Sequence, residues 1–181
     1  MRRAIVCCAL LLVSASARAE PLEPGSIGMV VAAAGGTGVD FKRLGFGYQI
    51  GGQAAWQPTV TERRLGWSAK WSFVFGTMYN AGAASVGDQL LTLQMDMMLG
   101  VRIRPGTNPF RYVALRAGGE LLRANQVVPP ENHRAFAGAV ASIGYEQYAY
   151  GFLFNLDARV SQIGNGPTIA ALMFGAGKTG P

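Results

Sequence analysis

Hydrophobic and polar residues alternate between positions 44 and 56, over a stretch that is long for a strand in a soluble protein. Leu44, Phe46, Tyr48 and Ile50 share one parity, and the positions between them carry only glycine and glutamine. Because alternate side chains of a strand point to opposite faces, the segment predicts a strand with one bulky apolar face and one small, polar face. At about 3.3 Å per residue and a tilt of about 45°, a strand of this length crosses a hydrocarbon layer of roughly 30 Å.

The same alternation recurs along the chain and predicts eight strands joined by short links. The expected strands are 27–34, 44–56, 65–78, 89–104, 110–122, 135–148, 151–162 and 168–176. An open sheet would leave two unpaired edges, which cannot face lipid, and closure into a barrel removes both. The predicted fold class is therefore all-β, a closed eight-stranded antiparallel up-and-down (meander) barrel that crosses a membrane.

Residue size predicts which face of the barrel turns outward. The apolar faces carry more bulk than an eight-stranded interior can hold; among these residues are Trp67, Trp71, Phe73, Phe75, Leu91, Met95, Phe152 and Phe154. The opposite faces are rich in glycine, serine, alanine and threonine, as a narrow interior requires. We therefore expect the apolar face to contact lipid, as in an outer-membrane barrel. The alternative is a soluble, periplasmic lipocalin-like barrel that holds a ligand among the apolar side chains.

The first nineteen residues have the features of a secretory signal peptide. Arg2 and Arg3 precede a short apolar run at 4–13, and Ala17-Arg18-Ala19 fits a small-x-small cleavage site. We therefore expect residues 1–19 to be a signal peptide and 20–181 to form the barrel domain. Both cysteines lie within the apolar run, so the mature chain would contain no cysteine and no disulfide.

The charge of the chain does not indicate a nucleic-acid partner. The formal net charge is +6, and the three arginines before position 19 account for half of it. No basic run with interleaved aromatic residues is present. Only 14% of the residues are charged, which is low and consistent with a chain that is largely embedded in lipid.

Most charged residues of the predicted strands fall on the small, polar face. We predict that they form a polar network in the lumen, made of Lys70, Asp96, Arg102, Arg116, Glu120, Glu146, Asp157 and Arg159, with Arg104 beside them. Counting along the hairpin places Lys70 almost opposite Asp96, at cross-strand distance. Charges in so narrow an interior have to be paired, and the near balance of signs favours a plugged lumen over a selective pore. A small pore or solute conduit is the alternative.

Aromatic residues surround three of the predicted turns, all on the side of the chain termini. We predict interfacial aromatics at Trp56, Trp67, Tyr145, Tyr148 and Tyr150. The termini would then face the periplasm, and the segments 35–43, 80–88, 123–134 and 164–167 would be outer loops.

The sequence offers little for catalysis. Its single histidine, His133, follows Glu131 by two residues, in a proline-containing segment with no adjacent serine. A catalytic triad requires a base within hydrogen-bond reach of its nucleophile, and a transition-metal site requires several His or Cys ligands. We therefore predict no catalytic, cofactor-binding or metal-binding residue.

Taken over nearly the whole mature chain, the strand pattern resembles the small outer-membrane barrels of the OmpA/OmpX-like class. The resemblance implies insertion in the outer membrane, contact with its lipid, a monomeric state and a non-enzymatic structural or surface-interaction role carried by the outer loops. One feature departs from that class, whose barrels usually end on an aromatic residue. Here Phe174 is followed by Gly-Ala-Gly-Lys-Thr-Gly-Pro.

Overall fold

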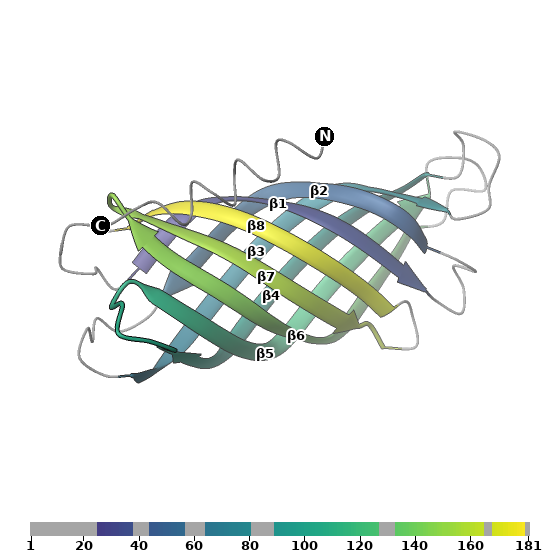
Figure 1. Cartoon of the computed structure of the whole chain (residues 1–181). Helices are drawn as coiled ribbons and strands as arrows, with labels where there is room; N and C mark the ends of the chain where they lie inside the picture. The colour runs from purple at the N-terminus through teal and green to yellow at the C-terminus, as the bar shows by residue number, and fades with distance from the viewer. Residues whose placement is uncertain are drawn as a thin grey trace.

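Eight tilted strands form one closed barrel (Figure 1). In this computed structural model, the described residues are 25–37, 44–56, 64–80, 89–126, 133–164 and 168–179. The strands are β1 Gly25–Thr37, β2 Leu44–Trp56, β3 Leu65–Asn80, β4 Gln89–Ile103, β5 Arg111–Gln126, β6 His133–Ala149, β7 Phe152–Gln162 and β8 Thr168–Thr179. The proposed signal peptide at 1–19 lies outside the described residues.

Every strand pairs antiparallel with its neighbour in the sequence, and β1 closes the barrel against β8. The pairing of β1 with β8 runs from Ser26 opposite Thr179 to Thr37 opposite Thr168, so the closing seam is as long as an ordinary hairpin. This order is a meander, and it confirms the predicted fold class. Closure leaves no unpaired edge, which is the condition for placing a sheet in lipid.

Five strands extend further than the hydrophobic pattern predicted: β1 to Thr37, β3 to Asn80 and β8 to Thr179, together with β5 and β6. The sequence analysis placed 123–134 in a loop, whereas β5 continues to Gln126, β6 begins at His133, and Asn125 lies opposite His133. The prediction ended the strands where apolar alternation ends. Ladder hydrogen bonds do not depend on side-chain polarity, so the sheet continues past that point.

The turn between β6 and β7 shows how the chain reverses at the end that holds both termini. Tyr150 and Gly151 both have positive φ, of 53° and 73°. This is the backbone of a type I′ turn, whose twist matches that of the two flanking strands. A β-branched residue at either position would be strained.

Side chains of each strand alternate between exposed and buried, and the exposed ones are apolar. On β4, Met97 is 63% and Leu99 57% exposed, whereas Asp96 and Met98 beside them are almost fully buried. Trp71 and Phe75 on β3 are about half exposed as well. The barrel therefore presents a hydrocarbon surface outward, the arrangement of a membrane barrel and the reverse of a lipocalin.

No helix within the described ranges is long and apolar enough to span a bilayer.

A charge in the middle of this outer surface should destabilise the barrel in lipid. Met97 lies at the middle of β4, between Trp71 and Gly119, and Ile103 is the last residue of the same strand. We expect Met97→Arg to lower the free energy of unfolding by about 2–4 kcal/mol and the control Ile103→Arg by about 0–1 kcal/mol. Urea titrations of barrels reconstituted in vesicles measure both. Equal costs at the two positions would show that this surface does not face a bilayer.

Candidate functional site in the barrel lumen

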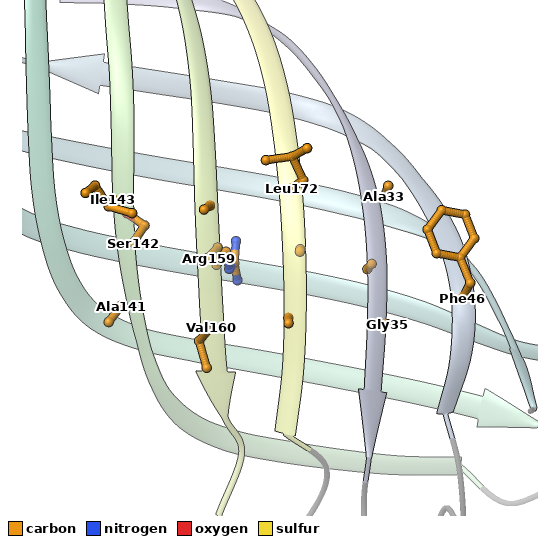
Figure 2. A pocket seen from close by; sticks show the side chains of 13 residues that line it. Ala33, Gly35, Phe46, Ala141, Ser142, Ile143, Arg159, Val160 and Leu172 are labelled. Carbon is orange, nitrogen blue, oxygen red and sulfur yellow. The ribbon is translucent and has the colours of Figure 1, made fainter. Parts of the chain in front are cut away.

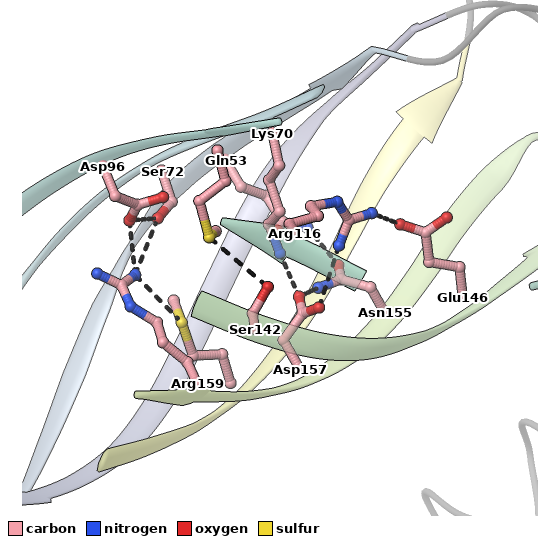
Figure 3. Close-up of polar contacts among 12 residues, drawn as sticks. Gln53, Lys70, Ser72, Asp96, Arg116, Ser142, Glu146, Asn155, Asp157 and Arg159 are labelled. Atoms are coloured by element: carbon pink, nitrogen blue, oxygen red, sulfur yellow. Dashed lines mark hydrogen bonds and ion pairs between the residues drawn. The ribbon is translucent and has the colours of Figure 1, made fainter. Parts of the chain in front are cut away.

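A first cluster of ions lies around Arg159 of β7. Its guanidinium donates to Asp96 Oδ2 of β4 at 2.6 Å and also pairs with Glu120 of β5. Ser72 donates to Asp96, and Ser161 donates to Glu120 at 2.6 Å. One arginine thus joins two acids from two neighbouring strands across the lumen. Figure 3 shows its contacts with Asp96 and Ser72.

Neutral side chains extend this cluster towards the end of the barrel that lies away from the termini. Gln94 of β4 donates to Glu120 Oε1 at 2.8 Å. Gln49 of β2 donates in turn to Gln94, and to Thr92 at 3.1 Å. Hydrogen bonds therefore connect β2, β4, β5 and β7 through the middle of the barrel.

A second cluster lies around Asp157 of β7, nearer the termini. This carboxylate accepts from Lys70 of β3, from Arg116 of β5 at 3.3 Å and from Asn155 at 2.6 Å. Arg116 also pairs with Glu146 of β6 and donates through Nε to Ser68 at 2.9 Å. Figure 3 shows Lys70 of β3 and Arg116 of β5 converging on Asp157 of β7, with Asn155 of the same strand beside it.

Two inward glycines leave the space that this second cluster occupies. A Cβ at Gly144 would overlap the Asp157 carboxylate. A Cβ at Gly175 would overlap the amide of Gln53 and the side chain of Asn155, which hydrogen-bond to each other at 2.6 Å. These two glycines therefore provide space for the side chains of the lumen network; their role is steric and does not depend on backbone flexibility.

The structure places all eight predicted lumen residues inside the barrel, each less than 5% exposed. They comprise four cations and four acids, namely Lys70, Arg102, Arg116 and Arg159 with Asp96, Glu120, Glu146 and Asp157. Arg104 follows the end of β4 and lies half-buried at the rim, outside these clusters.

The cross-strand partner of Lys70 lies two residues away from the one that counting along the hairpin predicted. Lys70 lies opposite Met98, and it is Ser72 that lies opposite Asp96. Lys70 and Asp96 are therefore diagonal neighbours, and the ammonium of Lys70 pairs with Asp157 instead. Strand tilt brings β7 side chains across the lumen to β3 and β4, and counting along one hairpin cannot reveal such a contact.

Arg102 and two tyrosines fill the lumen at the end near the termini. Arg102 donates to the Tyr148 hydroxyl at 3.2 Å, and its guanidinium lies 4.3 Å from the centre of the Tyr112 ring. The two tyrosine rings meet edge to face at 6.1 Å. Because Tyr148 is only 4% exposed, its assignment as an interfacial aromatic is wrong.

The other predicted interfacial aromatics lie on the outer surface or at the turn. Trp56 and Trp67 are partly exposed, with ring centres 4.1 Å apart. Tyr150 is exposed at the β6–β7 turn, and Tyr145 is half-buried. Tyr148 has the same parity as the inward residues of β6, whereas Tyr145 has the outward parity. This difference in the sequence could have identified Tyr148 as a lumen residue.

Apolar clusters cover the ionic network on both sides, and the sequence analysis did not predict them. Near the termini, Phe110 packs against a cluster of Ala55, Tyr112, Tyr148 and Leu153. Near the opposite end a larger cluster comprises Ala34, Met78, Leu122, Ala124, Ile163 and Ile169, with Phe136 and Ala171 packed against it. A third cluster, Val30, Ala32, Val74 and Met173, lies between them. These inward apolar residues were difficult to predict, because the alternation pattern assigned apolar residues in general to the outer face of each strand.

A groove lies outside the barrel, over β6, β7, β8, β1 and β2. It is open and shallow, has a volume of about 830 Å³, and is lined mainly by apolar residues such as Ala33, Phe46, Ile143 and Leu172 (Figure 2). Apart from Ser142 and Arg159, whose side chains are buried, its lining consists of apolar residues and one glycine.

No metal centre is visible in the part of the chain that the structure describes. No group of three or more His, Cys, Asp or Glu side chains is arranged to hold a metal ion within these residues. His133 is the first residue of β6 rather than part of a loop.

Comparison with solved structures relates this fold to known membrane barrels. The chain matches Ail, the attachment invasion locus protein of Yersinia pestis, with a TM-score of 0.63 and 12% identity over 88% of this chain and 99% of that one. It matches Neisserial surface protein A with a TM-score of 0.60 and 14% identity over 89% and 100% of the two chains. It matches OprG of Pseudomonas aeruginosa with a TM-score of 0.56 and 10% identity over 89% and 97%.

These matches show that the chain has the fold of the small eight-stranded outer-membrane β-barrels. No family model matches the sequence. No curated protein matches it either.

Removing the cation at the centre of the first ionic cluster should leave two buried acids without their partner. We expect Arg159→Met to lower the free energy of unfolding by about 3–5 kcal/mol, the usual cost of breaking a buried ion pair by removing one member. The triple variant Arg159→Met, Asp96→Asn, Glu120→Gln should recover much of that loss because no net charge remains. Urea unfolding in vesicles compares the two, and a single variant as stable as the wild type would show that the pairs do not hold the barrel together.

Proposed function

We propose that this chain is an outer-membrane protein whose barrel is a sealed anchor. Its function is then a non-catalytic interaction with a partner, carried by the segments that join strands at the end opposite the termini. The proposal includes export by a cleaved signal peptide at 1–19, contact with outer-membrane lipid and a monomeric state. The observation that carries it is the combination of an apolar outer surface with a lumen whose ions are paired and covered at both ends.

The outer surface supports insertion in a bilayer. Ile27 is 77% exposed and Phe46 69% exposed, on strands that cross the whole height of the barrel. All four acids in the described ranges are buried inside. A soluble barrel would invert this distribution, because apolar surface of this extent in water would cause aggregation.

The lumen supports an anchor rather than a pore. Four cations face four acids within it, and the ion pairs of Lys70, Arg116 and Arg159 join different strands. A cation- or anion-selective path would require an excess of one sign. Tyr112 and Leu153 close one end and Met78 and Leu122 the other, each at most 1% exposed.

With the lumen closed, the ends of the barrel remain as places for interaction. The segments 38–43, 81–88, 127–132 and 165–167 connect strands at the end away from the termini. Their lengths allow variation without disturbing the barrel, as is usual for connections that carry function. Ail of Yersinia pestis, which has the same fold, has been solved with the heparin analogue sucrose octasulfate, so a barrel of this kind can bind a partner molecule.

The closed lumen predicts the electrical behaviour of the protein. Barrels reconstituted in planar bilayers should give no steady unitary conductance, because paired ions and apolar side chains leave no continuous water path. A large open porin prepared in the same way is the positive control. Steady conductance from the refolded chain would refute the sealed anchor and favour the conduit.

The orientation predicts which segments are accessible from outside the cell. An epitope inserted within 127–132 should be labelled by antibody on intact cells, whereas one placed after Tyr150 at the β6–β7 turn should be labelled only after the outer membrane is permeabilised. Labelling of the second site on intact cells would invert the orientation, and labelling of neither site even after permeabilisation would contradict exposure of these turns.

A further inference from the structure

Given the membrane placement and orientation proposed above, we propose that the outer face of the barrel binds a phosphorylated glycolipid near the end away from the termini. One lipid phosphate lies at Arg123, and one acyl chain lies in an apolar groove that Arg123 itself lines. The height of Arg123 in the bilayer, the shape of the groove and the charge of this surface support the site.

The register of the strands determines their tilt. Following directly opposite residues around the barrel from Lys178 of β8, through Met97 of β4, leads back to β8 at Thr168, ten residues nearer the other end of the barrel. A row of paired residues therefore climbs as it goes round the barrel, and the strands lie at about 40° to the barrel axis. Figure 1 shows this inclination.

Arg123 and Lys178 lie at opposite boundaries of the apolar surface. The row that starts at Lys178 crosses β5 at Gly119, and Arg123 lies four residues further from the termini. At about 4.8 Å between strands and about 3.3 Å per residue, Arg123 is about 25 Å from Lys178 along the barrel axis. The apolar band of an outer-membrane barrel is also about 25 Å tall. Each of these two exposed cations is therefore level with one lipid–water boundary.

The groove beside Arg123 results from a difference in side-chain size between neighbouring strands. It has a volume of about 320 Å³, and its lining includes Leu93, Met95, Leu121, Arg123, Ala135 and Ala137. Leu93, Arg123 and Ala135 lie in one row, and Met95, Leu121 and Ala137 lie in the next row towards the middle of the barrel. Because the outward residues of β6 are alanines here, the larger side chains of β4 and β5 stand above them and leave an apolar channel.

The groove runs from Arg123 towards the middle of the bilayer without a sideways offset. Met95 is reached from Arg123 by two residues along β5 to Leu121 and one step to the neighbouring strand. At a tilt of about 40°, the first move shifts the position sideways by about 4 Å, and the second shifts it back by nearly as much. Met95 therefore lies about 8 Å deeper than Arg123, almost directly below it. Since one leaflet of the hydrocarbon core is about 15 Å thick, an acyl chain below a phosphate at Arg123 enters this groove.

The charge of this surface suits a phosphate. Arginine binds phosphate oxygens in a bidentate manner, and its long side chain can extend from the apolar surface to the headgroups. All four acids of the described ranges lie in the lumen, so no carboxylate among the described side chains of the outer face competes for Arg123. A phosphate monoester carries about −1.5 to −2 charges near neutral pH and a phosphodiester about −1, so the monoester should be held more strongly.

The surface beside the groove can accommodate further acyl chains. The outward residues of β6 continue from Ala137 as Ala139 and Ala141, and Ala141 lines the groove over β6, β7, β8, β1 and β2. In the proposed orientation this part of the barrel faces the outer leaflet, where the lipid of an outer membrane is a phosphorylated glycolipid with several acyl chains. A cation at the boundary, with two apolar grooves below and beside it, matches that lipid.

A single spin label can report which lipid lies at this site. The chain after residue 19 contains no cysteine. Leu91 is 45% exposed and precedes Leu93 by two residues on β4, so it lies beside the groove without lining it. The full mature chain with Leu91→Cys would carry a nitroxide and be refolded into bilayer discs with equal amounts of lipid A, phosphatidylglycerol and phosphatidylcholine. Broadening of each phosphorus-31 resonance then compares the three lipids in one sample, and heat-modifiable migration on a gel reports folding separately.

We expect the lipid A phosphates to be broadened about fivefold more than the phosphate of phosphatidylcholine at low salt, the contribution of roughly one basic residue. Phosphatidylglycerol should lie between them. Arg123→Gln should make the three lipids nearly equal, whereas the control Lys178→Gln removes the same charge at the opposite boundary and should keep the preference. Ala137→Leu fills the groove and should reduce the broadening of lipid A, whereas Ala117→Leu, on β5 outside the groove, should not.

The outcomes that would overturn the proposal can be told apart. Equal broadening of the three lipids in a folded barrel would remove the site and leave the sealed anchor standing. Phosphatidylglycerol broadened as strongly as lipid A would assign the site to any anionic lipid and rule out selection of the glycolipid. A preference lost equally in the Lys178 variant would assign it to net charge. A chain without heat-modifiable migration would contradict the membrane barrel itself, and the lipid site with it.

Discussion

Pairing of charges inside a cylinder too narrow for bulk water is the constraint on which this structure depends. Eight strands enclose a space that side chains fill completely. An ion left without a partner there would cost several kcal/mol, so each cation needs an acid within reach. Arg159 of β7 joins Asp96 of β4 to Glu120 of β5, and Arg116 of β5 pairs with Glu146 of β6 and with Asp157 of β7. Each arginine thus has at least one partner on a strand that is not its neighbour in the sheet.

The same constraint explains the abundance of glycine and the choice of neighbouring residues. Gly144 and Gly175 face inward where the Asp157 carboxylate and the Gln53–Asn155 pair need space. Serines and glutamines complete the remaining hydrogen bonds, as Ser161 and Gln94 do for Glu120. Because bulky residues cannot enter this interior, they are left for the outer surface, and the exterior becomes apolar for the same steric reason that the interior is polar.

A filled lumen shifts the possible functions of the molecule to its two ends and its outer surface. At the end near the termini, Tyr112 and Tyr148 close the interior with Arg102, while Trp56 and Trp67 lie on the outer surface. At the other end, Met78 and Leu122 close the interior beneath the connections between strands. Interaction with a partner through these connections is therefore compatible with a filled lumen, since it does not require the lumen to open.

The number of strands, their approximate limits and the direction in which each face turns could all be predicted from the amino-acid sequence. These properties are local: alternation has a period of two, and residue size decides which face fits inside. The sequence also identified the eight lumen charges by their parity, although their role as a site remains a prediction. Only the tertiary structure decided which charges pair, because tilt and closure bring β7 against β3, β4 and β5, and no count along a single hairpin contains that information. The inward position of Tyr148 and the apolar clusters at both ends likewise depend on how the strands are arranged around the axis, which a linear pattern does not specify.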